Sequence, residues 1–338
     1  MISEIRRDFA CARALELVLL AIVALCPVRL EAQSYPSRPV RILIPNPPGG
    51  PTDIVARLYS AKLTTQLSQS FFVESRPGPN GIVVANATIS APADGYTLAF
   101  SSIGGQVLQP AINAYLKKPQ EPNVLRLLVP VSLLAITPLA LVVNPSSGVN
   151  SVKDLIAYAK ADRGKLNYGT AGAGGSDHLS TELFNQAAGI TAVHVPYKGQ
   201  FASVNALLSG EIHYSFPGLG GVLPYHRSGK LKILAIGGPS RSAKEILPEV
   251  PTLAEAANLP GFDVSSWFAM FAREGTDPAI VSLLSREIQK AAEAPDLIDR
   301  LKLIGIDAKG STPEQLAAQV DADLKTWGNL LRTGNVKF

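Results

Sequence analysis

The feature that most constrains this chain is a strand, a glycine-rich turn and a helix in direct succession. Residues 40–63 carry it as VRILIPNPPGGPTDIVARLYSAKL. The first six residues are apolar except for Arg41 and rich in β-branched side chains, which is typical of a buried strand. Residues 54–63 place apolar side chains on one helical face, and Pro51 suits the first helical position. Such a turn directs backbone N–H groups and a positive helix end at one point, so it favours either an anion site or a plain tight connection.

The same unit recurs along the chain, which predicts an α/β fold with parallel sheets formed by right-handed crossovers. Glycine-rich segments again follow strands at residues 101–105 and 170–176. We expect further strands at 71–74, 96–100, 127–135, 139–144, 165–169, 192–196, 212–216, 231–237 and 264–271. We expect helices at 82–90, 152–161, 177–188, 201–209, 223–228, 278–292, 295–304 and 312–333, one from about residue 106, and one capped at 250–252. Ligands of open α/β sheets bind beyond the carboxyl ends of the strands, where these glycine-rich loops lie.

The first 32 residues have the three-part layout of a secretory signal peptide. Three arginines precede an apolar run at residues 17–26 that is too short to span a bilayer. Small residues follow, and cleavage is expected after Ala32. A lipoprotein leader that uses Cys26 is the alternative, but Leu25 before it is a poor match. We therefore expect export to the periplasm.

Both cysteines, Cys11 and Cys26, lie in this leader. The mature chain would contain no disulfide, thiol nucleophile or cysteine-ligated metal. The four histidines show no metal-ligand spacing, so we expect neither a metal nor a cofactor. The net charge is +4 and no basic cluster is interleaved with aromatic residues, which argues against nucleic acid as a partner.

The sequence contains none of the familiar catalytic motifs. Ser176 and His178 are the only suggestion of a nucleophile and base, but residues two apart do not face each other on a helix. We instead expect Ser176 to cap the helix and His178 to point into a cleft or to a backbone partner. Uncharged donors accumulate at the strand ends, which suits reversible capture of a carboxylate: Thr52, Ser101, Ser102, Thr170, Ser176 and Tyr197.

Seven ordered segments resemble the Bug family, the extracytoplasmic solute-binding receptors of tripartite tricarboxylate transporters. They are YPSRPVRILIPNPPGGPTDIVARL, VESRPGPNG, APADGYTLAF, KLNYGTAGAGGSDHLSTELF, VHVPYKG, EVPTLAEA and SSWFAMFA. The resemblance implies a type II periplasmic-binding-protein fold, here with residues 33–134 and 253–338 in the first lobe and 135–252 in the second. It implies a monomer without enzymatic activity that closes on a small carboxylate and works with membrane permease subunits.

The resemblance also implies which residues hold the ligand. In the first lobe these are Asn46, Pro48, Gly49, Gly50, Thr52, Asp53, Ser101 and Ser102. In the second lobe they are Thr170, Gly172, Gly174, Ser176, His178, Tyr197, Phe216 and Pro217.

Four departures from the family pattern bear on these expectations. Asn46 stands where an aromatic residue is common, which adds an amide to the expected pocket wall. Pro217 stands where many members have an aspartate, so we expect a ligand without a cationic amine. Ser75 lies within a Glu-Ser-Arg segment that often reads Glu-Asn-Arg, and residues 120–128 depart from the usual approach to the fourth strand.

Two other functions are alternatives to the transport receptor. The first is a ligand-binding sensor protein that signals to a kinase in a two-component system. The second, less favoured, is a serine hydrolase.

Overall fold

A computed structural model describes residues 35–78, 81–117, 127–161, 166–239, 241–333 and 336. The chain divides into a unit of residues 1–37 and a unit of residues 38–338, and the fold below is that of the second unit. The expected signal peptide and most of the atypical segment 120–128 lie outside the described residues. In the part of the chain that the structure covers, no helix combines the length and apolarity needed to cross a membrane.

The first sheet has six strands in the order β11-β4-β10-β3-β1-β2. Parallel pairing joins β1 (Val40–Ile44) to β2 (Phe71–Ser75) and to β3 (Thr97–Ser102). Antiparallel pairing joins β10 (Ser266–Arg273) to β3 and to β4 (Leu128–Thr137), and β11 (Asp307–Ala308) to β4. The sheet is therefore mixed.

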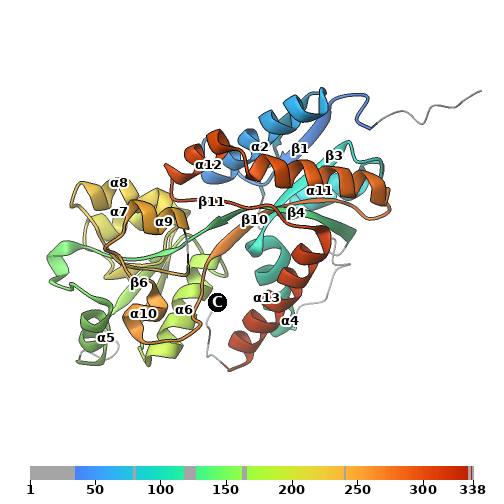
Figure 1. Cartoon of the computed structure of the whole chain (residues 1–338). Coiled ribbons are helices and arrows are strands. Elements are labelled where there is room, and N and C mark those ends of the chain that lie inside the picture. Colours follow the sequence, from blue (N-terminus) through green and yellow to red (C-terminus); the bar gives the residue numbers. More distant parts are fainter. Residues whose placement is uncertain are drawn as a thin grey trace, which may run out of the picture. The chain divides into compact units, whose positions relative to one another are not determined.

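Helices cover both faces of this sheet (Figure 1). On one side lie α2 (Pro51–Leu67), α11 (Pro278–Ala292) and α12 (Pro295–Lys302). On the other lie α4 (Gln109–Tyr115), which follows the π-helix η2 (Gly104–Leu108), and the long α13 (Pro313–Thr333). Helix α3 (Ile82–Ser90) packs on β3.

The second sheet has five strands in the order β7-β6-β8-β5-β9. Strands β7 (Val193–Pro196), β6 (Asn167–Thr170) and β8 (Tyr214–Ser215) are parallel, and β5 (Ala140–Val143) pairs antiparallel with β8 and with β9 (Lys232–Ile236). The helices on this side of the fold are α5 (Val152–Ala161), α6 (Ser176–Ala188), α7 (Gln200–Leu208), α8 (Leu219–Arg227), α9 (Arg241–Ile246) and α10 (Leu253–Ala257), with a short η4 (Pro145–Ser147).

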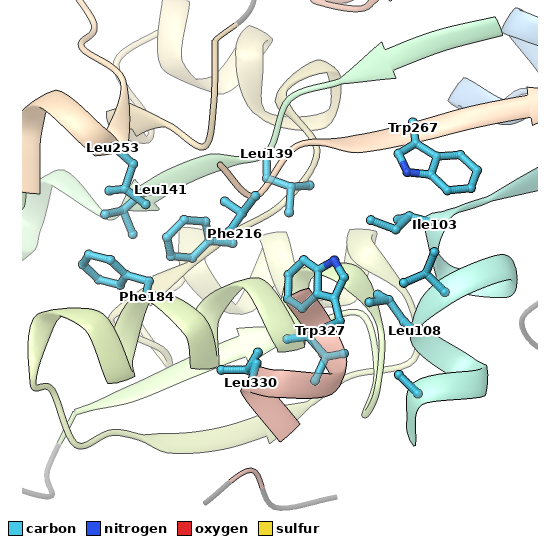
Figure 2. Packing of buried hydrophobic residues seen from close by; sticks show 14 of the residues in the cluster. Ile103, Leu108, Leu139, Leu141, Phe184, Phe216, Leu253, Trp267, Trp327 and Leu330 are labelled. Carbon is cyan, nitrogen blue, oxygen red and sulfur yellow. The ribbon is translucent and has the colours of Figure 1, made fainter. Parts of the chain in front are cut away.

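One hydrophobic cluster draws residues from both sheets and from α13. Figure 2 shows Trp327 and Leu330 of α13 in the same cluster as Phe184 and Phe216, with Trp267 of β10 nearby. A second cluster lies mainly around β5, β9, α7 and α8, with Ile212, Ala243 and Leu247. The helix–sheet packing thus buries apolar faces without any need for disulfides.

The expectation of parallel sheets is wrong for the strands that link the two halves. The chain leaves the first sheet through β4 and returns to it through β10, so these neighbours run in opposite directions.

Because β4 continues to Thr137, the expected lobe boundary at residue 135 falls inside this strand. Likewise α10, beyond the expected boundary at 252, packs against α5 and β9.

Candidate functional site

Two glycine-rich segments lie where neighbouring parallel strands end. In the first sheet, β1 and β3 pair in parallel with Leu43 opposite Ala99. Their carboxyl ends therefore share one edge of the sheet, which is the edge where α/β proteins bind ligands. The turn at residues 45–50 and the end of β3 meet there.

The first turn leaves open space beside its backbone. Gly49 has a φ of +92°, a conformation that favours glycine. Gly50 is the N-cap of α2 and offers no side chain to cap it, and Pro51 opens the helix as the sequence predicts. A Cβ atom built on Gly49 or Gly50 would meet no atom within 4 Å. The first N–H groups of a helix lack partners within the helix, so this turn can present them to a ligand.

An ion pair between the buried Asp53 and the exposed Arg57 fixes the shape of this turn. Asp53, 5% exposed, accepts a hydrogen bond from the Gly49 N–H at 3.0 Å and one from Arg57 Nε at 2.9 Å. Burial opposes ionisation of this carboxyl, but the bonds from Arg57 and Gly49 outweigh it and lower its pKa. Asp53 therefore holds the turn in place by accepting from the Gly49 N–H, and its charge is balanced by Arg57.

Asn46 is held at both of its oxygen atoms. Thr52 Oγ1 donates to Asn46 Oδ1 at 3.1 Å, and Ser75 Oγ donates to the Asn46 carbonyl at 2.7 Å. The residue itself is exposed. Its amide therefore keeps two N–H donors on the side away from Thr52.

Ser101 and Ser102 are the last residues of β3, two residues beyond the expected end of this strand. Ser101 is buried, and its Oγ accepts a bond from Gln106 Nε2 at 3.1 Å. Gln106 lies in η2, so the helix expected near residue 106 begins with a turn of π-helix. Such turns are frequent at functional sites.

The second group of predicted residues lies at the corresponding edge of the other sheet. Strand β6 pairs in parallel with β7 and β8, so the segments after all three strands meet at one edge. Two backbone bonds tie them together, from the Tyr197 N–H to the Thr170 carbonyl and from the Gly199 N–H to the Ala171 carbonyl, both at 3.0 Å. The predicted residues of this half are therefore neighbours.

The second turn uses several of its own donors internally. The Gly172 N–H donates to Thr170 Oγ1 at 3.3 Å, and the Gly174 N–H donates to His178 Nδ1 at 3.0 Å. His178 and Thr170 are fully buried, and Thr170 Oγ1 lies 2.7 Å from His194 Nε2. Of the two expected roles of His178, a cleft residue or a group with a backbone partner, the structure shows the backbone partner. Gly175 and not Ser176 is the N-cap of α6.

The stacked imidazole rings of His178 and His194 both contact polar groups of this turn. The ring centroids of His178 and His194 lie 3.8 Å apart with an interplanar angle of 13°. Burial, with the charge of His194, lowers the pKa of His178 to about 3, and burial lowers that of His194 to about 4. Both rings are therefore neutral near pH 7.

A buried carboxylate also holds the second turn. Asp177, 9% exposed, accepts a hydrogen bond from the Ala171 N–H and one from the His178 N–H at 3.0 Å. Burial raises the pKa of Asp177 to about 6, in spite of the N–H bonds that favour its charge. Asp177, His194, Gln106 and Arg57 support the site but were not predicted as part of it. An aspartate shortly after a Gly-Gly pair, in both GGPTD and GGSD, is the signal that marks the two carboxylates.

The remaining predicted residues differ in exposure. The half-buried Tyr197 donates from its hydroxyl to Glu211 Oε1 at 2.7 Å. Phe216 is fully buried in the hydrophobic cluster, and Pro217 is buried with its carbonyl accepting from the Ala140 N–H at 2.9 Å. Among the described residues, no three histidine, cysteine, aspartate or glutamate side chains are grouped as a metal site would need. All sixteen ligand-contact assignments stay predictions.

This chain is similar to known proteins in both its sequence and its fold. The family model described as "Tripartite tricarboxylate transporter family receptor" matches residues 55–336. This chain belongs to that family. Among relatives in the family, Protein BugT of Bordetella pertussis is 36% identical over 309 residues, covering 91% of this chain and 93% of its own length.

Solved structures agree with this assignment. "R. palustris Rpa4515 with adipate" has a TM-score of 0.77 at 32% identity, covering 88% of this chain and 98% of that one. "MatC (Rpa3494) from Rhodopseudomonas palustris with bound malate" has a TM-score of 0.71 at 28% identity, covering 88% of this chain and 100% of that one. The periplasmic binding protein BugD has a TM-score of 0.73 at 27% identity, covering 90% of this chain and 99% of that one. The expected two-lobed periplasmic-binding-protein fold and the Bug resemblance are confirmed.

Proposed function

We propose that this receptor captures a small organic carboxylate between two lobes and delivers it to the membrane subunits of a tripartite transporter. The observation that carries the proposal is the first turn, where open space at Gly49 and Gly50 adjoins the uncapped start of α2. Adipate and malate, named for two structural relatives, are small carboxylic acids of the same class. The residues of the two sheet edges then act as the two halves of one clamp.

The clamp works by binding and not by catalysis. Side chains that bond to the backbone fix both turns, and the two buried aspartates among them, Asp53 and Asp177, accept bonds from the turns. The ligand is then held by neutral donors and the dipole of α2, without a cation of the protein. Closure follows because the ligand contacts both lobes only in the closed state.

The division into lobes and the route of export are part of the same proposal. The element boundaries favour a first lobe that contains β1 to β4 and β10 to α13, with β5 to α10 in the second. We infer that residues 1–32 are a cleaved signal peptide and that the receptor acts in the periplasm as a monomer. Light scattering and mass spectrometry of the exported protein measure both properties.

A panel of mono-, di- and tricarboxylates, assayed by thermal shift and calorimetry, tests the function. A ligand at 100 times its Kd should stabilise the folded protein by about 2.7 kcal/mol. Neutral amides and esters of the same acids are the matched controls and should give no shift. A protein that responds to no carboxylate, or equally to acid and amide, would contradict the proposal.

Gly50→Val tests the turn itself. The backbone angles of Gly50 suit any residue and a Cβ meets no neighbour, so the variant should fold with an unchanged melting temperature. Its side chain would fill the space beside the α2 N–H groups, and we expect carboxylate affinity to fall by at least about 100-fold, or about 2.7 kcal/mol. Gly50→Ala is the graded control and should lose less. Unchanged affinity in Gly50→Val would show that the turn is only a connection.

A further inference from the structure

The two glycine-rich turns are each held by a buried aspartate, but only one of these charges is balanced. Asp53 pairs with Arg57. Asp177 accepts from the N–H groups of Ala171 and His178, and among the described residues no lysine or arginine forms an ion pair with it. When ionised, Asp177 is therefore a buried negative charge at the start of α6, beside the second glycine-rich turn.

The titratable groups around Asp177 do not offset this charge. The rings of His178 on α6 and His194 on β7 both have lowered pKa values, so they are neutral when Asp177 is ionised. Tyr168 on β6 lies close enough for its own pKa to be raised in part by Asp177.

Two further ionisable residues lie on α6 itself and in the loop after β7. The Tyr168 hydroxyl donates to Glu182 of α6. Lys198, in the loop after β7 that is bonded to the turn through Gly199, is exposed. A charged Asp177 would thus repel the carboxylate of a ligand bound at this turn.

We propose that Asp177 is a positioning residue that couples ligand capture to proton uptake: the second turn accepts an anionic carboxylate when the Asp177 carboxylate has taken a proton from solvent. The inference rests on the proposed function. Its energetic basis is that burial already raises the pKa of Asp177 to about 6, and an adjacent anion raises the pKa of a carboxyl further. Affinity then increases as pH falls toward 6, although the ligand itself becomes no more charged.

The first test is a titration of the ligand-free protein by NMR. The backbone amide signals of Ala171 and His178 should shift with a single inflection near pH 6, because both groups donate to Asp177. Asp177→Asn should abolish the inflection. Asp154→Asn is the matched control. Asp154 also accepts a bond from a backbone N–H and lies in the first turn of a helix, α5, but it is exposed. A wild type without an inflection above pH 5 would contradict the proposal.

The second test measures affinity for the carboxylate panel, with adipate and malate as first probes, between pH 6 and 8.5. In the wild type, affinity should fall by up to about tenfold per pH unit above pH 7, and calorimetry in buffers of different ionisation enthalpy should show uptake of up to one proton. Asp177→Asn should bind with no such slope, and Asp154→Asn should behave as the wild type.

The outcomes separate the two proposals. Carboxylate binding that is independent of pH, or an equal slope in Asp177→Asn, would overturn the role of Asp177 and leave the proposed function intact. A wild type that binds no member of the panel at any pH would overturn the proposed function and the coupling with it.

Discussion

Asn46 can offer its amide N–H groups to a molecule outside the protein, because each of its two oxygen atoms already accepts a bond from a neighbouring hydroxyl group. Thr52 donates to its side-chain oxygen and Ser75 to its carbonyl. These two bonds also fix the orientation of the amide, which lowers the entropy that a ligand contact would otherwise cost. A polar group of a bound acid, such as a second carboxylate or a hydroxyl, is the partner that suits two N–H donors.

Asn46→Leu should therefore discriminate among acids. We expect affinity for adipate to fall about fivefold, which corresponds to loss of about 1 kcal/mol of hydrogen bonding. Affinity for hexanoate, which has the same chain length and one carboxylate, should be unchanged. Asn46→Asp keeps the acceptor for Thr52 but replaces the donors with a charge, and it should weaken adipate further. Equal effects of Asn46→Leu on both acids, measured by calorimetry, would remove Asn46 from the site.

At the scale of elements, periodic segments were predictable and special geometry was not. Helices 82–90, 152–161 and 278–292 have the predicted bounds. In 278–292 the Asp277 cap, the proline at the first helical position and the amphipathic pattern all agree. The π-helix at Gly104 and the short β11 were missed, since neither has a pattern that distinguishes it from ordinary helix or loop. Strand β10 was predicted at 264–271, but its antiparallel direction was not, because direction is set by distant pairing and not by local sequence.

The candidate site shows the same division. Its loops could be found from glycine, serine and threonine after each strand, because that composition reflects local backbone needs. The contacts that support these loops could not be found in this way. Thr170 of β6 contacts His194 of the neighbouring β7, and Ser101 at the end of β3 contacts Gln106 in the π-helix. Such contacts depend on register, which the sequence of one strand does not determine.

Strand β6 requires a glycine for packing, and this can be tested. A Cβ on Gly169 would lie 2.3 Å from Ile212 Cδ1, 2.9 Å from Ser203 Oγ and 3.2 Å from Tyr197 Cε2. Gly169→Ala should lower the free energy of unfolding by about 1–3 kcal/mol, as overpacked cores do. Gly328→Ala is the control within α13, where a Cβ meets nothing and helix propensity predicts a gain of up to about 1 kcal/mol. Urea unfolding measures both, and a stable Gly169→Ala would show that Tyr197 and Ile212 move aside freely.

For the whole molecule, the two segments that connect the sheets meet at one residue. Gly237, which follows β9, donates its N–H to the Leu139 carbonyl at 2.7 Å, and its carbonyl accepts from the Val264 N–H at 3.0 Å. Leu139 lies between β4 and β5, and Val264 lies between α10 and β10. A change in the angle between the two sheets would therefore move the backbone groups of Leu139 and Val264 that Gly237 bonds to.

Gly237→Ala should change the balance between open and closed forms more than it changes the fold. Its Cβ would lie 2.7 Å from Val264 Cγ2 and 3.1 Å from the Leu139 carbonyl, so both connecting segments must shift. Because apparent affinity scales with the fraction of binding-competent protein, a shift of about 1–2 kcal/mol would change carboxylate affinity about 5- to 30-fold. Gly218→Ala is the matched control, since Gly218 also pairs with Leu139 but its Cβ would meet only Gln200 Oε1, at 3.6 Å. Small-angle scattering with and without adipate measures the closure, and calorimetry measures the affinity. If Gly237→Ala and Gly218→Ala retain the same ligand-induced compaction and affinity, the two connecting segments bend elsewhere and Gly237 is not the point that couples them.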